Sequence, residues 1–272
     1  MNYIKELYGT RELLANLTMR EVKGKYRRTV LGQLWSLINP LATMLVYTVV
    51  FSFIFRAQPR VGDPSGLDIY PLWLMSGLLP WMFFTRVVNG GMASVISNAS
   101  LIKKVYFPRM HLPLAVVGST GFTWLNEMAV LSIALLVCGG FVLPWLPIVV
   151  VVMVLLAMFA SGLSMLLAVA NVHFRDMQHF TTILLQMWMY LTPIIYPISL
   201  VERQAEKYGS WLLDLYRLNP MERFVSVFRE LLYDNRFPDG GDFLWCVLWA
   251  FVVFALGAWV FQRNEKKLAE LL

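Results

Sequence analysis

Two charged residues, Arg86 and Glu127, are isolated within long apolar stretches. Arg86 is the only charge between Asp68 and Lys103, and Glu127 is alone in a longer interval further along. A charge at the centre of a bilayer costs at least ~2.5 to 3.5 kcal/mol, so each residue needs a partner or water. At ~1.5 Å rise per residue, the two lie ~16 and ~21 Å from the turn that connects their helices. We therefore expect an ion pair with a structural role.

Motifs for catalysis and for nucleotide binding are absent from the sequence. It has no GxxxxGK[ST] phosphate loop, no HExxH and no paired carboxylates in its apolar stretches. The lone Glu127 argues against a proton relay and against a transferase that uses metal-bound diphosphate. His173, Asp176 and His179 lie close together, but their setting favours a helix start over a metal site, and we expect no metal. If the protein uses ATP as an energy source, we expect the ATPase to be a separate chain.

The composition is that of a membrane protein. Hydrophobic residues make up 58% of the 272 positions and charged residues 15%, with a mean hydropathy of +0.60, whereas soluble domains are about a quarter charged. A span needs ~20 apolar residues, and a turn at 139–147 divides the longest charge-poor interval. We predict an all-α membrane protein with an N-terminal region, 1–33, and a six-span domain, 34–272. The spans cover about 34–55, 70–96, 114–137, 148–170, 177–198 and 243–262.

The distribution of Lys and Arg places both termini in the cytoplasm. We expect a multi-pass protein of the cytoplasmic (inner) membrane, and fourteen of the 23 basic residues fall in segments expected on its cytoplasmic side, where such residues are retained preferentially. The net charge of +6 therefore reflects topology and gives no support for nucleic-acid binding. Residues 3–28 are predicted to form an amphipathic interfacial helix that contacts membrane lipids or a partner. An ordinary basic flank that only fixes topology is equally compatible with this segment.

A basic elbow, residues 97–113, joins the second and third spans. Lys103, Lys104 and Arg109 place positive charge at a chain reversal. Ser97 and Asn98 are expected to cap a short helix, and the prolines at 108 and 113 to limit its length.

Aromatic and helix-breaking residues mark other spans. Tyr47 and Phe51 lie deep in span one and could line a path. Pro193 and Pro197 should break span five before it leaves the bilayer. Small residues at 90–91 and 160–164 predict close helix packing.

The segment 199–241 is too amphipathic for a simple loop and is predicted to form short outer helices. Asn219 is expected to cap a helix, with Pro220 at its first position and Glu222 completing a capping box. We interpret this helix as dipping into the outer leaflet or lying on it. A surface anchor without a gating task is the alternative.

Five ordered motifs give the sequence a family resemblance. REVKGKYRRTVLGQLWSLINPL, NASLIKKVYFPRMHLPL, NVHFRDMQHF, TPIIYP and LNPM, spread over essentially the whole chain, resemble the permease subunit of ABC exporters of polysaccharides. Such exporters move lipid-linked O-antigen, teichoic acid or galactan. One departure from the family pattern follows the Phe-Pro-Arg motif. Met110 and His111 stand where more acidic residues are expected.

The resemblance implies a homodimer with two copies of a cytoplasmic ABC ATPase, which holds the ATP and Mg. This chain is then a non-catalytic subunit that binds no cofactor. The elbow and the second inner connection, residues 171–180 between spans four and five, become coupling helices. Their ATPase contacts would be Asn98, Leu101, Lys103, Lys104, Tyr106, Phe107, Arg109, Arg175 and Asp176. Candidate sugar contacts in the channel are Tyr47, Phe51, Trp188 and Tyr190. The N-terminal helix is then a gate helix, and the outer helices an exit gate. The alternatives are an ABC permease for a smaller lipid or drug and a membrane enzyme acting on a lipid-linked sugar.

Overall fold

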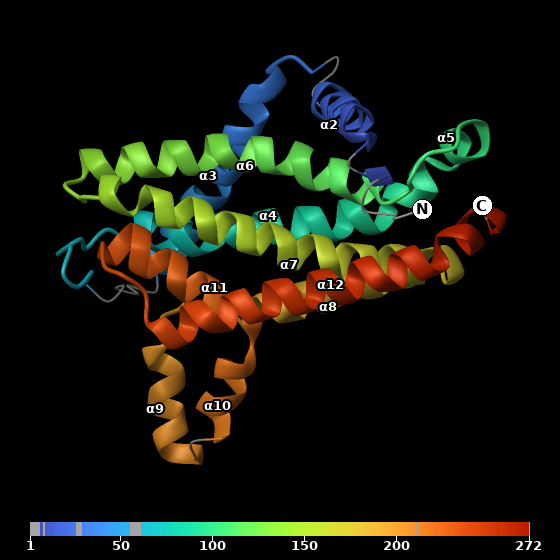
Figure 1. Ribbon diagram of the computed structural model, residues 1–272. Helices are drawn as coiled ribbons and strands as arrows, with labels where there is room; N and C mark the ends of the chain where they lie inside the picture. The colour runs from blue at the N-terminus through green and yellow to red at the C-terminus, as the bar shows by residue number, and fades with distance from the viewer. Residues whose placement is uncertain (1–5, 8, 26–28, 55–60, 210, 272) are drawn as a thin grey trace.

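The computed structural model describes residues 6–7, 9–25, 29–54, 61–209 and 211–271, and it is built from helices throughout this part of the chain (Figure 1). The helical elements in chain order are α2 (Arg11–Lys25), η1 (Gly32–Leu34), α3 (Trp35–Tyr47), η2 (Thr48–Ile54), α4 (Tyr70–Ser97), α5 (Ala99–Lys104), α6 (His111–Val137), η3 (Leu143–Trp145), α7 (Leu146–His173), α8 (Met177–Tyr190), α9 (Ser199–Tyr208), α10 (Trp211–Leu218), α11 (Pro220–Arg229), η4 (Glu230–Asp234) and α12 (Gly240–Glu270).

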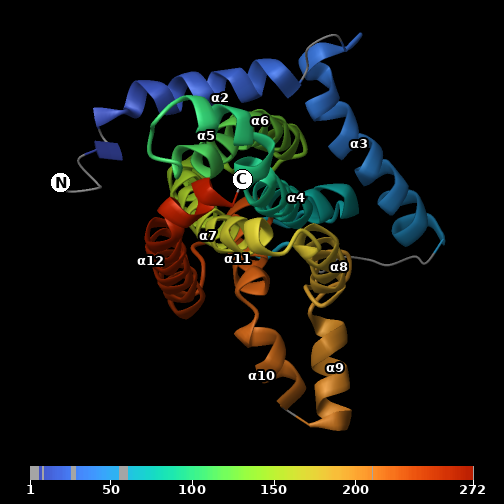
Figure 2. The ribbon, with the colours of Figure 1, turned by 90° about the vertical axis from the view of Figure 1, so that its right-hand side faces the viewer.

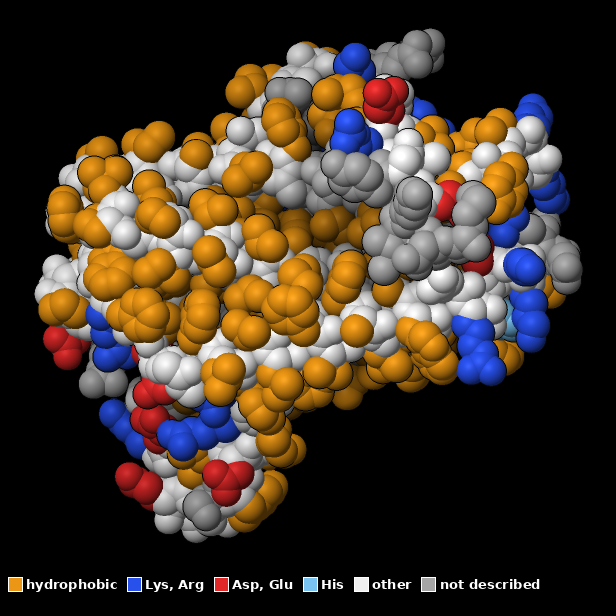
Figure 3. Space-filling model, in the orientation of Figure 1, with side chains coloured by type: hydrophobic (Ala, Val, Ile, Leu, Met, Phe, Trp, Pro, Cys, Tyr) orange, Lys and Arg blue, Asp and Glu red, His pale blue; other side chains and the backbone are white. Residues whose placement is uncertain are grey.

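Four of the described helices are long and apolar enough to cross a membrane. They cover Tyr70–Ser97, His111–Val137, Leu143–His173 and Gly240–Leu268, and they lie side by side in one bundle (Figure 1). Their bounds agree with the predicted spans two, three, four and six to within a few residues, except that α12 continues well past the predicted end at 262. Figure 3 shows an apolar surface along the bundle, with charged side chains gathered toward its ends.

The predicted first and fifth spans form shorter helices. Span one consists of α3 followed by the wider turns of η2, with Pro40 inside α3. Span five is helical only in α8, because the chain leaves the helix after Tyr190 and turns through Pro193 and Pro197. The expected break at these prolines is therefore present.

Small residues set the distances between the central helices. A Cβ on Gly91 of α4 would lie 2.6 Å from Ser164 Cβ of α7, and one on Gly257 of α12 would lie 2.2 Å from the carbonyl oxygen of Gly162. Such close approach lets the backbones of neighbouring spans meet directly. The small-residue faces predicted at 90–91 and 160–164 are both used.

Aromatic rings fill the centre of the bundle, where α4, α6, α7 and α11 converge. Phe83 stacks on Trp124 with ring centroids 4.0 Å apart, and Phe228 of α11 meets Trp124 edge-on. Most of α11 is buried within the protein, so of the two interpretations, a helix dipping into the outer leaflet or one lying on it, the second is wrong. Its apolar residues point to more than one side, and the helix inserts into the core instead.

Two further elements leave the bundle. The hairpin of α9 and α10 projects sideways from it in both ribbon views (Figures 1 and 2). Helix α2 crosses one side of the bundle, and α3 stands away from α12 beyond α4 and α8 (Figure 2). A Cβ on Gly118 of α6 would lie 2.9 Å from Thr18, which shows how closely α2 rests on α6.

Candidate functional site

The elbow presents a small exposed surface at one end of the bundle. Tyr106 is 83% exposed and Val105 53%, and both lysines at 103 and 104 are exposed at the end of α5. This surface is available for contact with another chain.

The other side of the elbow is buried. Ile102 and Phe107 are 7% and 5% exposed and share one hydrophobic cluster with Leu17 of α2 and Leu268 of α12. Leu101 is partly buried against the same cluster. Phe107, expected among the ATPase contacts, is therefore placed inside the protein, where it anchors the elbow.

Asn98 connects the elbow to two helices. Its Nδ2 donates to the carbonyl oxygen of Ser94 at 2.9 Å, and its Oδ1 accepts from Arg20 Nη2 of α2 at 2.5 Å. No side-chain hydrogen bond caps α5, so the expected capping role of Asn98 is wrong. The amide instead faces back toward α4 and α2.

Arg109 and His111 tie the second half of the elbow to other segments. The backbone N–H of Arg109 donates to Glu265 Oε1 at 2.6 Å, and its guanidinium donates to the Glu265 carbonyl oxygen. Thr10 Oγ1 lies 2.7 Å from Nε2 of the buried His111. The elbow is thus held from one side by the N-terminal segment and from the other by α12.

The second inner connection makes fewer side-chain hydrogen bonds to other helices than the elbow does, among the described residues. Arg175 and Asp176 are exposed, and Asp176 immediately precedes α8 without a side-chain capping bond. His173 Nδ1 lies 2.9 Å from the carbonyl oxygen of Val169. The structure therefore leaves Arg175 and Asp176 accessible at the surface.

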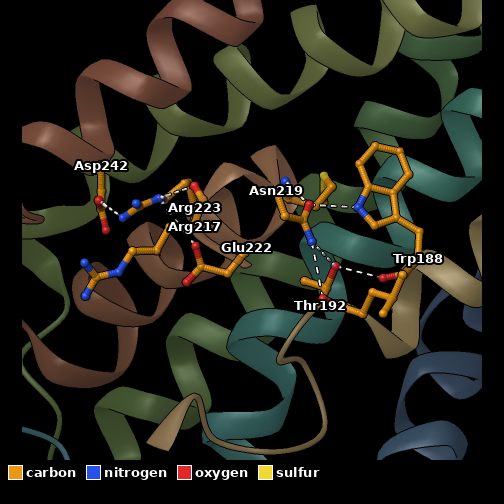
Figure 4. Close-up of polar contacts among 9 residues, drawn as sticks. Trp188, Thr192, Arg217, Asn219, Glu222, Arg223 and Asp242 are labelled. Carbon is orange, nitrogen blue, oxygen red and sulfur yellow. Dashed lines mark hydrogen bonds and ion pairs between the residues drawn. The ribbon is translucent and has the colours of Figure 1, made fainter. Parts of the chain in front are cut away.

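Asn219 organises the opposite part of the molecule (Figure 4). Its Oδ1 accepts from Met221 N at 3.0 Å, as expected for a cap, and also from Trp188 Nε1 at 2.8 Å. Its Nδ2 donates to Thr192 Oγ1 at 3.0 Å. One amide thus joins the start of α11 to the end of α8.

The expected capping box at α11 is not formed. The buried carboxylate of Glu222 lies 3.5 Å from Arg223 Nε, and Arg223 in turn pairs with Asp242 of α12 (Figure 4). Burial raises the pKa of Glu222 to about 7, although Arg223 acts in the opposite direction. Glu222 therefore contributes to a charged cluster between α11 and α12.

The candidate channel residues occupy different environments. Tyr47 of α3 is half-buried and packs against the central hydrophobic core, whereas Tyr190 at the end of α8 is 59% exposed. Trp188 is half-buried, with its ring edge-on to Phe84 at 5.3 Å and to Trp81 at 6.2 Å. The side chain of Phe51 lies outside the described residues. The structure thus packs Tyr47 on the core and Trp188 against α4, and it leaves Tyr190 exposed at the end of α8.

Comparison with known proteins shows the family. The model of the ABC-2 type transporter family matches residues 12–233. The chain belongs to the ABC-2 type transporter family. An O-antigen export system permease protein, RfbA, of Myxococcus xanthus is 30% identical over 98% of both chains. RfbA of Klebsiella pneumoniae is also 30% identical, over 96% of this chain and 95% of that one. The polysialic acid transport protein KpsM of Escherichia coli is 21% identical over 92% of each.

In this ABC-2 protein the two isolated charges meet. Arg86 Nη1 donates to Glu127 Oε1 at 2.7 Å, and the Glu127 side chain is fully buried. Arg86 also lines a polar cavity of about 520 Å³ beside α2, together with Lys25 and Ser94. The arginine therefore has both a partner and a polar cavity that can hold water, as expected for a charge within spans.

We predict that Glu127→Ala lowers the free energy of unfolding by about 1.5–3 kcal/mol, because it leaves the partly buried Arg86 without its charged partner. Thermal unfolding of the purified protein in detergent measures this. The double variant R86L/E127L should recover much of the loss, since it removes both charges. A Glu127→Gln variant of full stability that has lost transport would contradict the structural role and move Glu127 to the transport pathway.

Arg229 was not identified by sequence reasoning. Its Nη1 and Nη2 donate to the carbonyl oxygens of Pro193 and Ile194 at 2.6 and 2.5 Å, and its guanidinium lies 3.8 Å from the centre of the Trp73 ring. Tyr70 Oη donates to the next carbonyl oxygen, that of Ile195, at 3.0 Å. The only signal in the sequence is the helix break itself, which frees carbonyls that need donors.

Glu265 was also missed, and its role can be measured. We predict that Glu265→Ala costs about 1–2 kcal/mol, because the partly buried Arg109 N–H loses its acceptor. Lys266→Ala, one residue away and exposed, should be neutral. Thermal unfolding of the two variants makes the comparison, and equal melting temperatures would show that the Arg109–Glu265 contact does not hold the elbow.

Proposed function

We propose that this chain is the transmembrane permease subunit of an ATP-driven ABC transporter that exports lipid-linked polysaccharide across the cytoplasmic membrane. The observation that carries the proposal is the geometry of the elbow. It exposes Tyr106, while its other residues bind to α2, α4 and α12. The full-length similarity to permeases named for O-antigen export supports the substrate class.

The elbow suits the reception of force from an ATPase. Hydrophobic burial and the bonds of Asn98 and Arg109 join it to three helices. A push on Tyr106 and the neighbouring lysines is therefore passed to the bundle instead of bending a loose loop. We propose that two copies of a cytoplasmic ATPase, which hold ATP and Mg, bind here and near Arg175 and Asp176. This chain is then non-catalytic.

The topology that we propose has six spans with both termini in the cytoplasm. The continuous helical stretch 35–54, formed by α3 and η2, is long enough to cross at ~1.5 Å per residue. Helix α8 has 14 residues and reaches only ~21 Å, so the turn that follows it completes the crossing. The carbonyls of that turn are satisfied by Arg229 and Tyr70, which makes a broken span tolerable.

Exposed apolar residues on α3 and α8 support a homodimer. Leu41 and Leu45 of α3 and Ile183 and Met187 of α8 are between 43% and 62% exposed. Two copies facing each other across these helices would enclose a path bordered by Tyr47 and Tyr190. Ring faces contact the C–H faces of sugars without fixed hydrogen-bond geometry, so a polymer can slide past them.

Co-purification with an ATPase and measurement of its activity test the proposal. ATP hydrolysis by the complex is expected to rise when lipid-linked glycan is added. Hydrolysis that is identical with and without glycan, together with drug efflux that follows expression, would favour a small-molecule permease. Failure to bind any ATPase would favour a membrane enzyme.

A further inference from the structure

An apolar groove lies on the side of the bundle below α2. It has a volume of about 630 Å³ and is bounded by α2, α6 and α7, and the hollow between these helices is visible in Figure 3. Its walls include Met19 of α2, Leu125 of α6 and Val154 of α7, each about half exposed. Lys23 is the only charged side chain among the described residues that line it. We call this feature the α2 groove.

Two glycines of α6 determine the shape of the α2 groove. A Cβ on Gly118 would lie 2.9 Å from Thr18, so α2 touches α6 at this point. Three residues later, Gly121 lines the groove and a Cβ there would meet no atom within 4 Å. Residues three apart share a helix face. Helix α2 thus contacts α6 at Gly118, and the space beside Gly121 stays open.

The size of the groove selects a thin occupant. One turn of a helix with its side chains is ~10–12 Å wide and 5.4 Å long, which is roughly 500 Å³. The groove is therefore comparable in size to about one helical turn, so a helix of a second chain that docked here would extend beyond it. A flexible hydrocarbon chain does fit such a space.

The charge at the rim selects the head group. Lys23 is exposed and lies on α2, whose last turn also carries Lys25. Basic residues on an interfacial helix attract anionic lipids. We propose that the α2 groove binds one acyl chain of an anionic phospholipid, with its phosphate at Lys23. The inference rests on the membrane placement of α2 in the proposed function, but not on the exported substrate.

Native mass spectrometry of the full-length protein, purified from phosphatidylglycerol or phosphatidylcholine nanodiscs, tests this inference. The wild-type protein is expected to retain phosphatidylglycerol. Gly121→Leu places a side chain in the groove, where its Cβ would meet no atom within 4 Å. It should reduce the retained lipid about tenfold, since displacing two methylenes costs ~1.6 kcal/mol. Lys23→Gln should abolish the preference for phosphatidylglycerol over phosphatidylcholine.

Ala255→Leu is the matched control, because Ala255 is exposed on α12 away from the groove. Its lipid retention should equal that of the wild type. Equal retention by Gly121→Leu, or release of an isoprenoid phosphate in place of phospholipid, would overturn the assignment. Because retention is measured without export, its failure is separate from failure of the proposed transport activity.

Discussion

The substitution Arg229→Met is expected to leave little of the protein folded, because it removes most of the free energy of unfolding. The change removes two charge-assisted hydrogen bonds to the carbonyls of Pro193 and Ile194, each worth ~1.5–3 kcal/mol, and a desolvated cation–π contact with Trp73 worth up to ~2 kcal/mol. The expected loss is roughly 5 kcal/mol, which equals the whole stability of many proteins. Yield and thermal unfolding in detergent measure it.

The guanidinium of Arg229 stays positively charged although it is buried. Burial lowers the pKa of its guanidinium to about 9, while Tyr70 and Glu222 act in the opposite direction, so it is protonated at neutral pH. Arg229→Lys should be intermediate, because an ammonium cannot donate to both carbonyls in the planar geometry of arginine. The exposed Arg203 of α9 provides a control, and Arg203→Met should stay within ~0.5 kcal/mol. Equal melting of Arg229→Met and Arg203→Met would show that the broken span is held by other contacts.

Gly257→Leu is expected to separate the two helices α7 and α12. Its first side-chain carbon would lie 2.2 Å from the carbonyl oxygen of Gly162, and a Cβ on Gly162 would lie 2.4 Å from that of Val253. Because these neighbours are backbone atoms, they cannot rotate away. We expect a loss of about 3 kcal/mol or more, at the upper end of overpacking effects.

The comparison with a neighbouring position isolates the cause. Ala255→Leu adds a larger side chain two residues earlier on the exposed side of α12 and should leave the melting temperature unchanged. Gly257→Ala adds only one carbon and should already be destabilising. If Gly257→Ala melts like the wild type, the helices have room to move apart and the close contact does not contribute to stability.

Much of the architecture follows from local sequence patterns. The lengths of the intervals without charged residues predicted four spans to within a few residues at most ends. A pair of prolines predicted the break after α8. The Arg86–Glu127 contact was predictable because only two isolated charges were available and their depths matched. Asn219 with Pro220 gave the start of α11, because helix caps use residues adjacent in sequence.

Contacts between distant segments could not be predicted. Arg229, for example, bonds to carbonyls that lie 35 and 36 residues away in the sequence. Arg109 meets Glu265 across 156 residues. Asn98 was expected to act as a cap, but a long-range donor, Arg20, occupies its oxygen. Patterns of period 3.6 identify the faces of a helix, but they do not tell which of several buried faces meets which neighbour.

The most direct test of the account is ATP-dependent transfer of lipid-linked glycan into vesicles that contain the permease with its ATPase. Charge reversal of Lys103 and Lys104 in the elbow is compared with charge reversal of Lys266 and Lys267, which are exposed near the end of α12. The account predicts that the elbow variant assembles and hydrolyses ATP but transfers no glycan, while the α12 variant transfers it normally. Unaltered transfer by the elbow variant would contradict it.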